Sequence, residues 1–160
     1  MLKPLVSPKT LLKEIEDVFA SALAKRKIKE FEGCKLKAYV DQGGILTIGY
    51  GYTGPEVTQG MTITQLAADS LLSDKLRILG VEVTKILTVP VTQNQFDALI
   101  SLAYNIGIGN LRGSTLLKKL NNSDYKGAAE EFLKWHFVKA VPNEGLLKRR
   151  EAEKALFLSP

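Results

Sequence analysis

Apolar side chains along residues 7–23 recur at intervals of three and four positions, which is typical of one face of an amphipathic helix. Ser7, with proline directly after it, suits the beginning of this helix. The pattern weakens over the basic residues 25–27. Residues 28–32 then predict a further helical turn or segment that ends near Glu32.

The pattern changes between residues 33 and 54, where six glycines separate short stretches rich in β-branched and aromatic residues. Residues 36–40 and 45–48 have the composition of β-strands, and a pair of glycines between them suits a tight turn. This segment therefore predicts a β-hairpin or small sheet.

From about residue 62 onward the apolar spacing is helical again. Pro90 suits the end of one helical segment, and residues 151–158 form a last amphipathic turn or two. The candidate helix starts are Thr62 or Thr64, Thr92 or Asn94, Ser114, and Ser123 with Asp124.

The predicted order is thus a helix, a small glycine-rich sheet and then several helices, which is an α+β fold with segregated elements. A small β lobe of about residues 33–61 is expected to pack against a helical lobe of about residues 62–158. Such an arrangement leaves a cleft between the lobes, where substrate sites are often found.

Length and composition limit the classes of protein to which the chain belongs. A chain of 160 residues with 45% hydrophobic and 24% charged residues suits one domain with a real core. No apolar stretch approaches the roughly 18–20 residues of a membrane-spanning helix, and charged residues between positions 13 and 17 interrupt any signal-peptide core. The net charge of +5 favours anionic polymers without selecting nucleic acid, lipid phosphate or cell wall, and also suits a plain solvated face.

Residues with special chemistry are few. Cys34 is the single cysteine, so an internal disulfide is excluded and the role expected for it is that of a small packed residue. Trp135 is expected in the core on one face of a helix, and the single histidine, His136, in a structural or exposed place. Because no cluster of His, Cys and acidic residues has metal-ligand spacing, no metal and no cofactor are expected.

Glu32, Asp41 and Thr47 are the candidates for chemistry in and beside the glycine-rich segment. Glycoside hydrolysis commonly uses two carboxyl groups, one as an acid and one as a base or nucleophile. Glu32 lies at a predicted helix end beside the apolar Phe31, a setting that favours a protonated carboxyl group. Asp41 precedes the predicted turn, and the Thr47 hydroxyl can hold a water molecule. The same residues also suit a helix end, an Asx turn and an ordinary strand, so spacing alone leaves both interpretations open.

These residues carry a resemblance to a known family. The run FEGCKLKAY from Phe31, followed by Asp41 and by LTIGYG from Leu46, is similar to the active-site segment of phage-type lysozymes (glycoside hydrolase family 24). Further segments resemble the family's core helices and its C-terminal signature, in the same order, so the match covers about residues 28–158. These segments are 93–99, 104–107, 114–117, 145–146, 149–150 and Glu153.

The resemblance implies a lysozyme-like fold and a muramidase that cleaves the β-1,4 bond from N-acetylmuramic acid to N-acetylglucosamine. It implies Glu32 as the general acid, Asp41 as the group that orients or activates the attacking water, and Thr47 as a second group that holds this water. Arg149 occupies the place of a family arginine that pairs with the acid-bearing region. Asn105 occupies the place of a polar residue that lines the substrate groove.

One position departs from the family pattern. A histidine usually follows the Ile-Gly-x-Gly stretch and forms an ion pair that ties the lobes together, whereas this chain has Tyr52. Because Tyr52 cannot form that ion pair, the linkage of the lobes and the pH dependence of stability are expected to differ.

The resemblance is weaker before residue 28. Residues 1–27 are therefore expected to form an N-terminal helix or linker, and residues 28–160 a lysozyme domain. The expected partner is bacterial peptidoglycan, with anionic envelope polymers as a further partner, no nucleic acid, no stable membrane insertion and a monomeric state. The expected place of action is the host cell wall, in the periplasm. The protein is expected to reach it either as a released endolysin or as a component of a phage tail.

Three other functions stand beside the muramidase. A lytic transglycosylase needs the acid but has no use for a water held by Asp41 and Thr47. A non-catalytic wall-binding module would have lost Glu32 or Asp41, and both are present. A nucleic-acid-binding domain would explain the basic runs, but no nucleic-acid motif occurs. Inversion of configuration predicts carboxyl groups roughly 6.5–9.5 Å apart, and retention predicts about 5–5.5 Å.

Overall fold

The computed structural model describes residues 20–160, so most of the helix expected over residues 7–23 lies outside the described part. In chain order the elements are α2 (Ala22–Glu32), β1 (Lys35–Val40), β2 (Leu46–Gly49), α3 (Gln65–Ile86), α4 (Gln93–Ile106), α5 (Ile108–Arg112), α6 (Thr115–Asn121), α7 (Tyr125–Glu131), the 3-10 helix η2 (Phe132–Lys134), β3 (Phe137–Val138), β4 (Val141–Pro142) and α8 (Glu144–Leu158).

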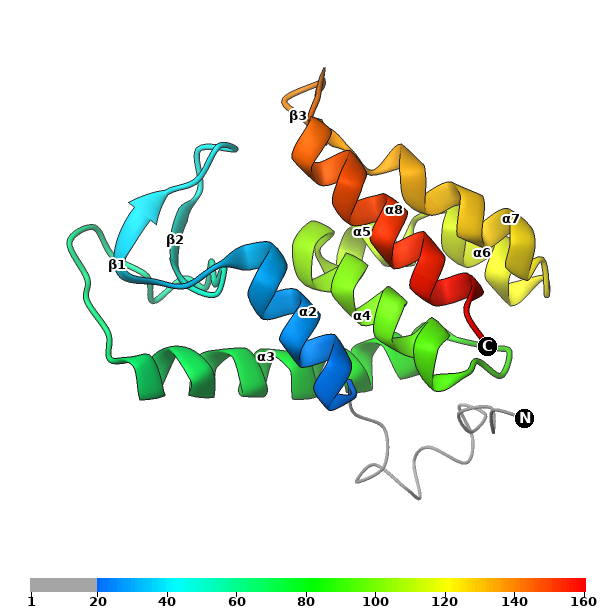
Figure 1. The fold of residues 1–160 in the computed structure, drawn as a ribbon, viewed down its shortest axis with the longest axis horizontal. Coiled ribbons are helices and arrows are strands. Elements are labelled where there is room, and N and C mark those ends of the chain that lie inside the picture. Colours follow the sequence, from blue (N-terminus) through cyan, green and yellow to red (C-terminus); the bar gives the residue numbers. More distant parts are fainter. Residues whose placement is uncertain (1–19) are drawn as a thin grey trace.

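Two lobes are joined by one long helix. Strands β1 and β2 pair in antiparallel fashion, with Tyr39 opposite Thr47, and form a small lobe at one end of the molecule (Figure 1). Helix α3 packs against β2 and also against α4, so it connects this lobe to the helices that follow. The arrangement confirms the predicted α+β fold, with a small sheet lobe and a larger helical lobe.

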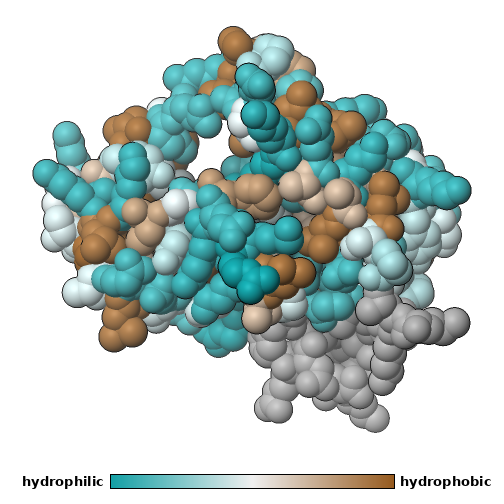
Figure 2. All heavy atoms as spheres, in the orientation of Figure 1, coloured by the Kyte–Doolittle hydropathy of each residue, from teal (hydrophilic) through white to brown (hydrophobic). Residues whose placement is uncertain are grey.

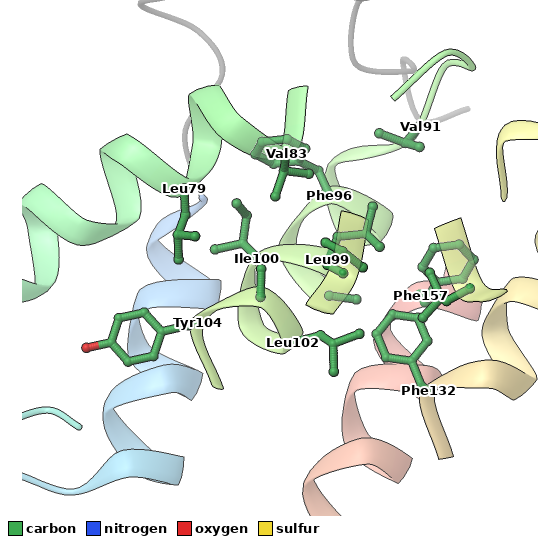
Figure 3. Close-up of a cluster of buried hydrophobic side chains, with 14 of the residues drawn as sticks. Leu79, Val83, Val91, Phe96, Leu99, Ile100, Leu102, Tyr104, Phe132 and Phe157 are labelled. Carbon is green, nitrogen blue, oxygen red and sulfur yellow. The ribbon is translucent and has the colours of Figure 1, made fainter. Parts of the chain in front are cut away.

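Helix α4 is the centre of the helical lobe. All of residues 96–104 are buried, because α2, α3, α5 and α8 pack around this helix. Leu99, Ile100 and Leu102 project into the surrounding apolar cluster, in which the rings of Phe132 and Phe157 lie 5.4 Å apart (Figure 3). Each large apolar side chain buried in this way contributes roughly 1.5–3 kcal/mol, so the helical lobe is a firm base for a site at its edge.

Four helices begin at residues that the sequence marks as caps. Thr64, Thr92, Ser114 and Asp124 each accept a hydrogen bond from the backbone N–H three residues further on. Thr92 also forms a capping box with Gln95. The structure thus selects Thr64 and Thr92 from the alternatives that the sequence left open.

Helix α2 has other bounds than the apolar pattern predicts, because its cap, Ser21, lies inside the range 7–23 expected for the first helix. It continues without a break through the basic residues 25–27, where the pattern weakens. The Lys25 ammonium donates to Ser73 at 2.6 Å, and that of Lys29 pairs with Asp69 at 3.2 Å, so α3 supplies partners for the basic face. The residue at which the lysozyme domain is expected to begin, Ile28, lies inside this helix and is buried.

The segment after α7 corrects the prediction of helices throughout the second half. The hairpin of β3 and β4 interrupts the helical run, and its turn has positive φ at Lys139 and Ala140. Helix α8 then begins at Glu144, well before residues 151–158, because Asn143 caps it by accepting a hydrogen bond from the Leu146 N–H at 2.8 Å.

Two single-residue expectations also meet the structure here. The expectation that Cys34 is packed is wrong, because its side chain is exposed just after α2. Trp135 directly follows η2 rather than lying on the face of a longer helix, and it is only partly buried against the core.

Candidate active site

Glu32 is delivered to the space between the lobes by α2, of which it is the last residue. The helix is anchored at its other end, where the cap Ser21 donates from its backbone and its hydroxyl to the buried carboxylate of Asp97 on α4. Gly33 ends the helix with a φ of 64°. The Glu32 side chain keeps 15% of its surface exposed, so it is enclosed but accessible.

Arg149 of α8 meets Glu32 at the edge of the gap between the lobes. Its Nη1 lies 2.5 Å from Oε1 of Glu32, and its Nη2 donates to the Ser101 carbonyl oxygen at 3.2 Å. The guanidinium also lies over the Phe31 ring, 4.9 Å from the centroid. The arginine that the resemblance places near the acid-bearing region is therefore in direct contact with Glu32.

The loop after β2 closes the other side of Glu32. At Gly51, which has a φ of 69°, a Cβ atom would lie 2.2 Å from Oε2 of Glu32, so the backbone approaches the carboxyl group as closely as a glycine allows. Tyr104 of α4 points its hydroxyl away from the apolar cluster (Figure 3) and donates it to the carbonyl oxygen of Tyr50. This hydrogen bond fixes the loop against the helical lobe.

Asp41 and Thr47 lie at the end of the hairpin of β1 and β2. Oδ1 of Asp41 accepts hydrogen bonds from the backbone N–H groups of Gly43 and Ile45, at 2.9 and 2.8 Å. Thr47 is 2% exposed, and its hydroxyl donates to the Ile45 carbonyl oxygen at 2.8 Å. The hairpin thus holds both side chains in fixed positions, and Asp41 also stabilises the turn.

A cavity of about 570 Å³ brings these side chains together. Glu32, Asp41, Thr47, Asn105 and Arg149 all line it, and they come from both lobes. Figure 2 shows the opening between the sheet lobe and the helical lobe. All five residues singled out from the sequence therefore line one cavity. Asp41 and Asn105 also line a second hollow, beside Trp135, so the two hollows adjoin.

The tyrosines around this cavity stay protonated at neutral pH. Burial raises the pKa of Tyr39, and the negative charges of Glu32 and Asp41 raise it further. Burial, with the Glu32 charge in addition, also raises the pKa of Tyr104. Both phenols are therefore neutral hydrogen-bonding groups at neutral pH.

Sequence reasoning did not find several residues on which this geometry depends. Gly51 stands in the LTIGYG run, yet only the structure shows that its missing side chain makes room for Glu32. Tyr104 reads as an ordinary apolar helix position. Asn143 donates to Gln42 across the mouth of the cavity at 2.9 Å, a contact between residues far apart in the chain that no local pattern predicts.

Tyr52, the departure from the family pattern, has partners of its own. Its hydroxyl donates to the Glu56 carboxylate, and Lys75 of α3 lies 5.9 Å from its ring centroid. Tyr52 therefore forms a hydrogen bond within the small lobe and has a cation of α3 near its ring.

Comparison with known proteins decides the family. The family model described as phage lysozyme matches residues 29–153. The chain belongs to this family. An endolysin of Acyrthosiphon pisum secondary endosymbiont phage 1 is 46% identical over 136 residues, which are 82% of this chain and 92% of that protein. An endolysin of Bacillus phage B103 is 47% identical over 134 residues, 82% of this chain, but the chain spans only 51% of that relative.

Solved structures agree. A mutant of the P22 lysozyme matches with a TM-score of 0.74 and 42% identity, over 88% of this chain and 99% of that one. These similarities confirm the predicted lysozyme-like fold and a glycosidase that hydrolyses peptidoglycan.

Two further observations concern the described residues alone. Between residues 20 and 160, no group of three or more His, Cys, Asp and Glu side chains is placed to hold a metal ion. In the same part of the chain, no helix has the length and apolar character needed to cross a membrane.

Proposed function

We propose that the cavity between the lobes hydrolyses the β-1,4 bond between N-acetylmuramic acid and N-acetylglucosamine, with Glu32 as the general acid. The observation that supports this best is the convergence of Glu32, Asp41 and Thr47, from a helix end and a hairpin, on one cavity. Asn105 and Arg149 line the same space from the helical lobe and are proposed to contact the substrate and to orient the acid.

The proposed reaction is a single displacement. The Glu32 carboxyl group donates its proton to the glycosidic oxygen while the bond from that oxygen to the anomeric carbon breaks. Asp41 accepts a proton from a water molecule whose oxygen forms the new bond to the anomeric carbon. Thr47, held by the hairpin, orients this water by hydrogen bonding. The products are a new reducing end and a free hydroxyl group on the leaving sugar.

A lytic transglycosylase is the second candidate for the same cavity. In that reaction a hydroxyl group of the sugar itself attacks, so no water needs to be held. The presence of Asp41 and Thr47 on the cavity wall favours the hydrolase.

The experiment that separates the two is mass spectrometry of fragments released from purified peptidoglycan by the wild type, by Glu32→Gln and by Glu30→Gln. Glu30 is exposed on the same helix and serves as the matched control. We expect reducing-end fragments from the wild type and from Glu30→Gln, and a loss of roughly 10²–10⁴-fold in rate for Glu32→Gln. Anhydro-ended fragments, one water lighter, would overturn the hydrolase and leave Asp41 and Thr47 without their roles.

The proposal also covers the binding partner and the place of action of the protein. The basic side chains, which give the net charge of +5, favour encounter with an anionic bacterial envelope. The protein is proposed to act as a monomer on the host cell wall, either as a released endolysin or as part of a phage tail. Lysis of whole cells is then expected to slow as salt rises, and a flat salt dependence would contradict the electrostatic contribution.

A further inference from the structure

Behind the candidate acid lies a carboxylate that the proposed reaction does not use. Glu153 of α8 is 2% exposed and does not line the cavity between the lobes. Its Oε2 accepts a hydrogen bond from the Ser101 hydroxyl and another from Nε of Arg149 at 3.3 Å. Its Oε1 forms an ion pair with Nε of Arg150 at 2.7 Å.

Arg149 joins this buried carboxylate to the candidate acid. One edge of its guanidinium contacts Glu32 through Nη1 at 2.5 Å, and its Nε contacts Glu153. Its Nη2 is held by the Ser101 carbonyl oxygen. Ser101 therefore binds both Arg149 and Glu153, and the guanidinium has little freedom to turn away from Glu32.

The direct contact between Arg149 and Glu32 creates a difficulty for acid catalysis. A neighbouring positive charge favours the ionised form of a carboxyl group, whereas a general acid needs its proton. A second negative charge on the same guanidinium opposes this effect, because it offsets the positive charge that Glu32 experiences. Glu153 is the carboxylate in that position.

We propose that Glu153 is a positioning residue that holds the Arg149 guanidinium on Glu32 and offsets its positive charge there. This inference rests on the proposed role of Glu32 as the general acid. The charged side chains that face Glu153 come from three helices within the described part of the chain. They are Lys27 of α2, Asp97 of α4, and Arg149 and Arg150 of α8.

The surroundings of Glu153 suit an electrostatic role. Arg150 is fully buried, and burial lowers its pKa to about 10, still far above neutral pH, so it remains a cation beside Glu153. Burial raises the pKa of Glu153, while Arg150 and Arg149 oppose this rise. Asp97 accepts hydrogen bonds from Ser21. Glu153, by contrast, forms an ion pair with Arg149.

The test is the pH dependence of kcat/KM on soluble glycan fragments for Glu153→Gln, Glu153→Asp and Glu151→Gln. Glu151 is exposed on the same helix and is the matched control. In Glu153→Gln, Arg149 acts on Glu32 without an opposing charge, so the alkaline limb moves to lower pH. We expect a loss of roughly threefold or more at pH 8 and a change within about twofold at pH 5. Glu153→Asp keeps the charge and is expected to restore most of the wild-type profile.

A role limited to stability predicts a different result. It predicts an equal loss at every pH, or no loss in protein that circular dichroism shows to be folded, and either result overturns the proposal. Removal of one partner from a buried ion pair can unfold a protein, whereas replacing both partners by apolar side chains is often tolerated. If Glu153→Gln does not fold, the double variant Arg150→Met with Glu153→Leu is measured in its place. Because this variant also removes the Arg150 cation, a smaller alkaline shift in the same direction is expected, and an unshifted profile overturns the proposal.

The failure of this proposal can be distinguished from failure of the proposed function. If Glu32→Gln is inactive and the Glu153→Gln profile is unshifted, Glu32 remains the acid and Glu153 is only structural. If Glu32→Gln retains activity, both proposals fail together.

Discussion

At the scale of single residues, the candidate site depends on how closely the backbone approaches Glu32. Gly51 and Gly60 both have positive φ, 69° and 80°, so a side chain strains the backbone at either position. Only at Gly51 would the added Cβ meet an atom, Oε2 of Glu32 at 2.2 Å, whereas nothing lies within 4 Å of a Cβ at Gly60. Comparison of substitutions at these two glycines therefore separates the effect of backbone strain from the effect of displacing the Glu32 side chain.

We predict that Gly51→Ala lowers kcat/KM by at least roughly tenfold, because Glu32 must move, and that Gly60→Ala does not. Both variants are expected to lose a similar free energy of unfolding, about 1–2 kcal/mol. Activity on purified peptidoglycan and thermal unfolding measured on the same preparations check this. Equal activity in the two variants would show that Glu32 tolerates the displacement.

The residues of the site divide into those that the sequence could predict and those that it could not. Glu32, Asp41 and Thr47 follow from the resemblance to a family, since spacing alone left helix-end, turn and strand interpretations open. The packing of Cys34 was predicted wrongly, because a residue just after a helix end reads the same whether it turns inward or outward. The role of Gly51 depends on an approach in space that no local pattern contains.

At the scale of elements, α8 carries Arg149 of the candidate site. The side chain of Asn143, at the start of this helix, forms two hydrogen bonds. Oδ1 of Asn143 accepts from the Leu146 N–H at 2.8 Å and caps the helix. Its Nδ2 donates to Oε1 of Gln42 at 2.9 Å and links the lobes. Substitution by aspartate keeps an acceptor for the cap and removes the donor for the link.

We predict that Asn143→Ala lowers the free energy of unfolding by about 1 kcal/mol, and that Asn143→Asp lowers it much less, because loss of the cap is the larger effect. Gln42→Ala, which removes only the link, is the control and is expected to resemble Asn143→Asp. Urea unfolding of the three variants measures the differences. If Asn143→Asp were as destabilising as Asn143→Ala, the link between the lobes would contribute more than the cap.

The elements could be predicted where they carry their own signals. Thr64, Thr92, Ser114 and Asp124 mark helix starts that the structure confirms, since a cap is a contact within one turn. The hairpin of β3 and β4 was missed, because two-residue strands have too short an apolar pattern to be distinguished from a helix end. The continuity of α2 through its basic residues depends on partners from α3, which are remote in the chain.

At the scale of the whole molecule, the two lobes are linked by contacts beside α3. Tyr104 donates to the Tyr50 carbonyl oxygen, and Asn143 donates to Gln42. Neither of these contacts depends on a histidine. The lobes are thus joined across the cavity even though the ion pair common in the family is absent.

The last prediction concerns the pH dependence of stability that follows from Tyr52. Its hydrogen bond to Glu56 raises the pKa of Tyr52 to about 12 and lowers the pKa of Glu56. A phenol with a raised pKa stabilises the fold below its usual pKa near 10, and this contribution is lost as pH rises toward 12. A carboxylate with a lowered pKa stabilises the fold above its usual pKa of 4.5, and this contribution is lost as pH falls further.

We therefore predict that the difference in Tm between the wild type and Tyr52→Phe is constant from about pH 5 to 9 and shrinks below pH 4. Tyr52→His, which introduces the residue usual in the family, is expected to behave differently. A histidine beside Glu56 has a raised pKa, so its contribution is present below about pH 6.5 and is lost as pH rises through neutrality. Thermal unfolding of the three proteins between pH 3 and 9 checks both statements. A difference for Tyr52→Phe that changes around pH 7 would mean that another titrating group, and not the pair of Tyr52 and Glu56, sets the pH dependence in this part of the molecule.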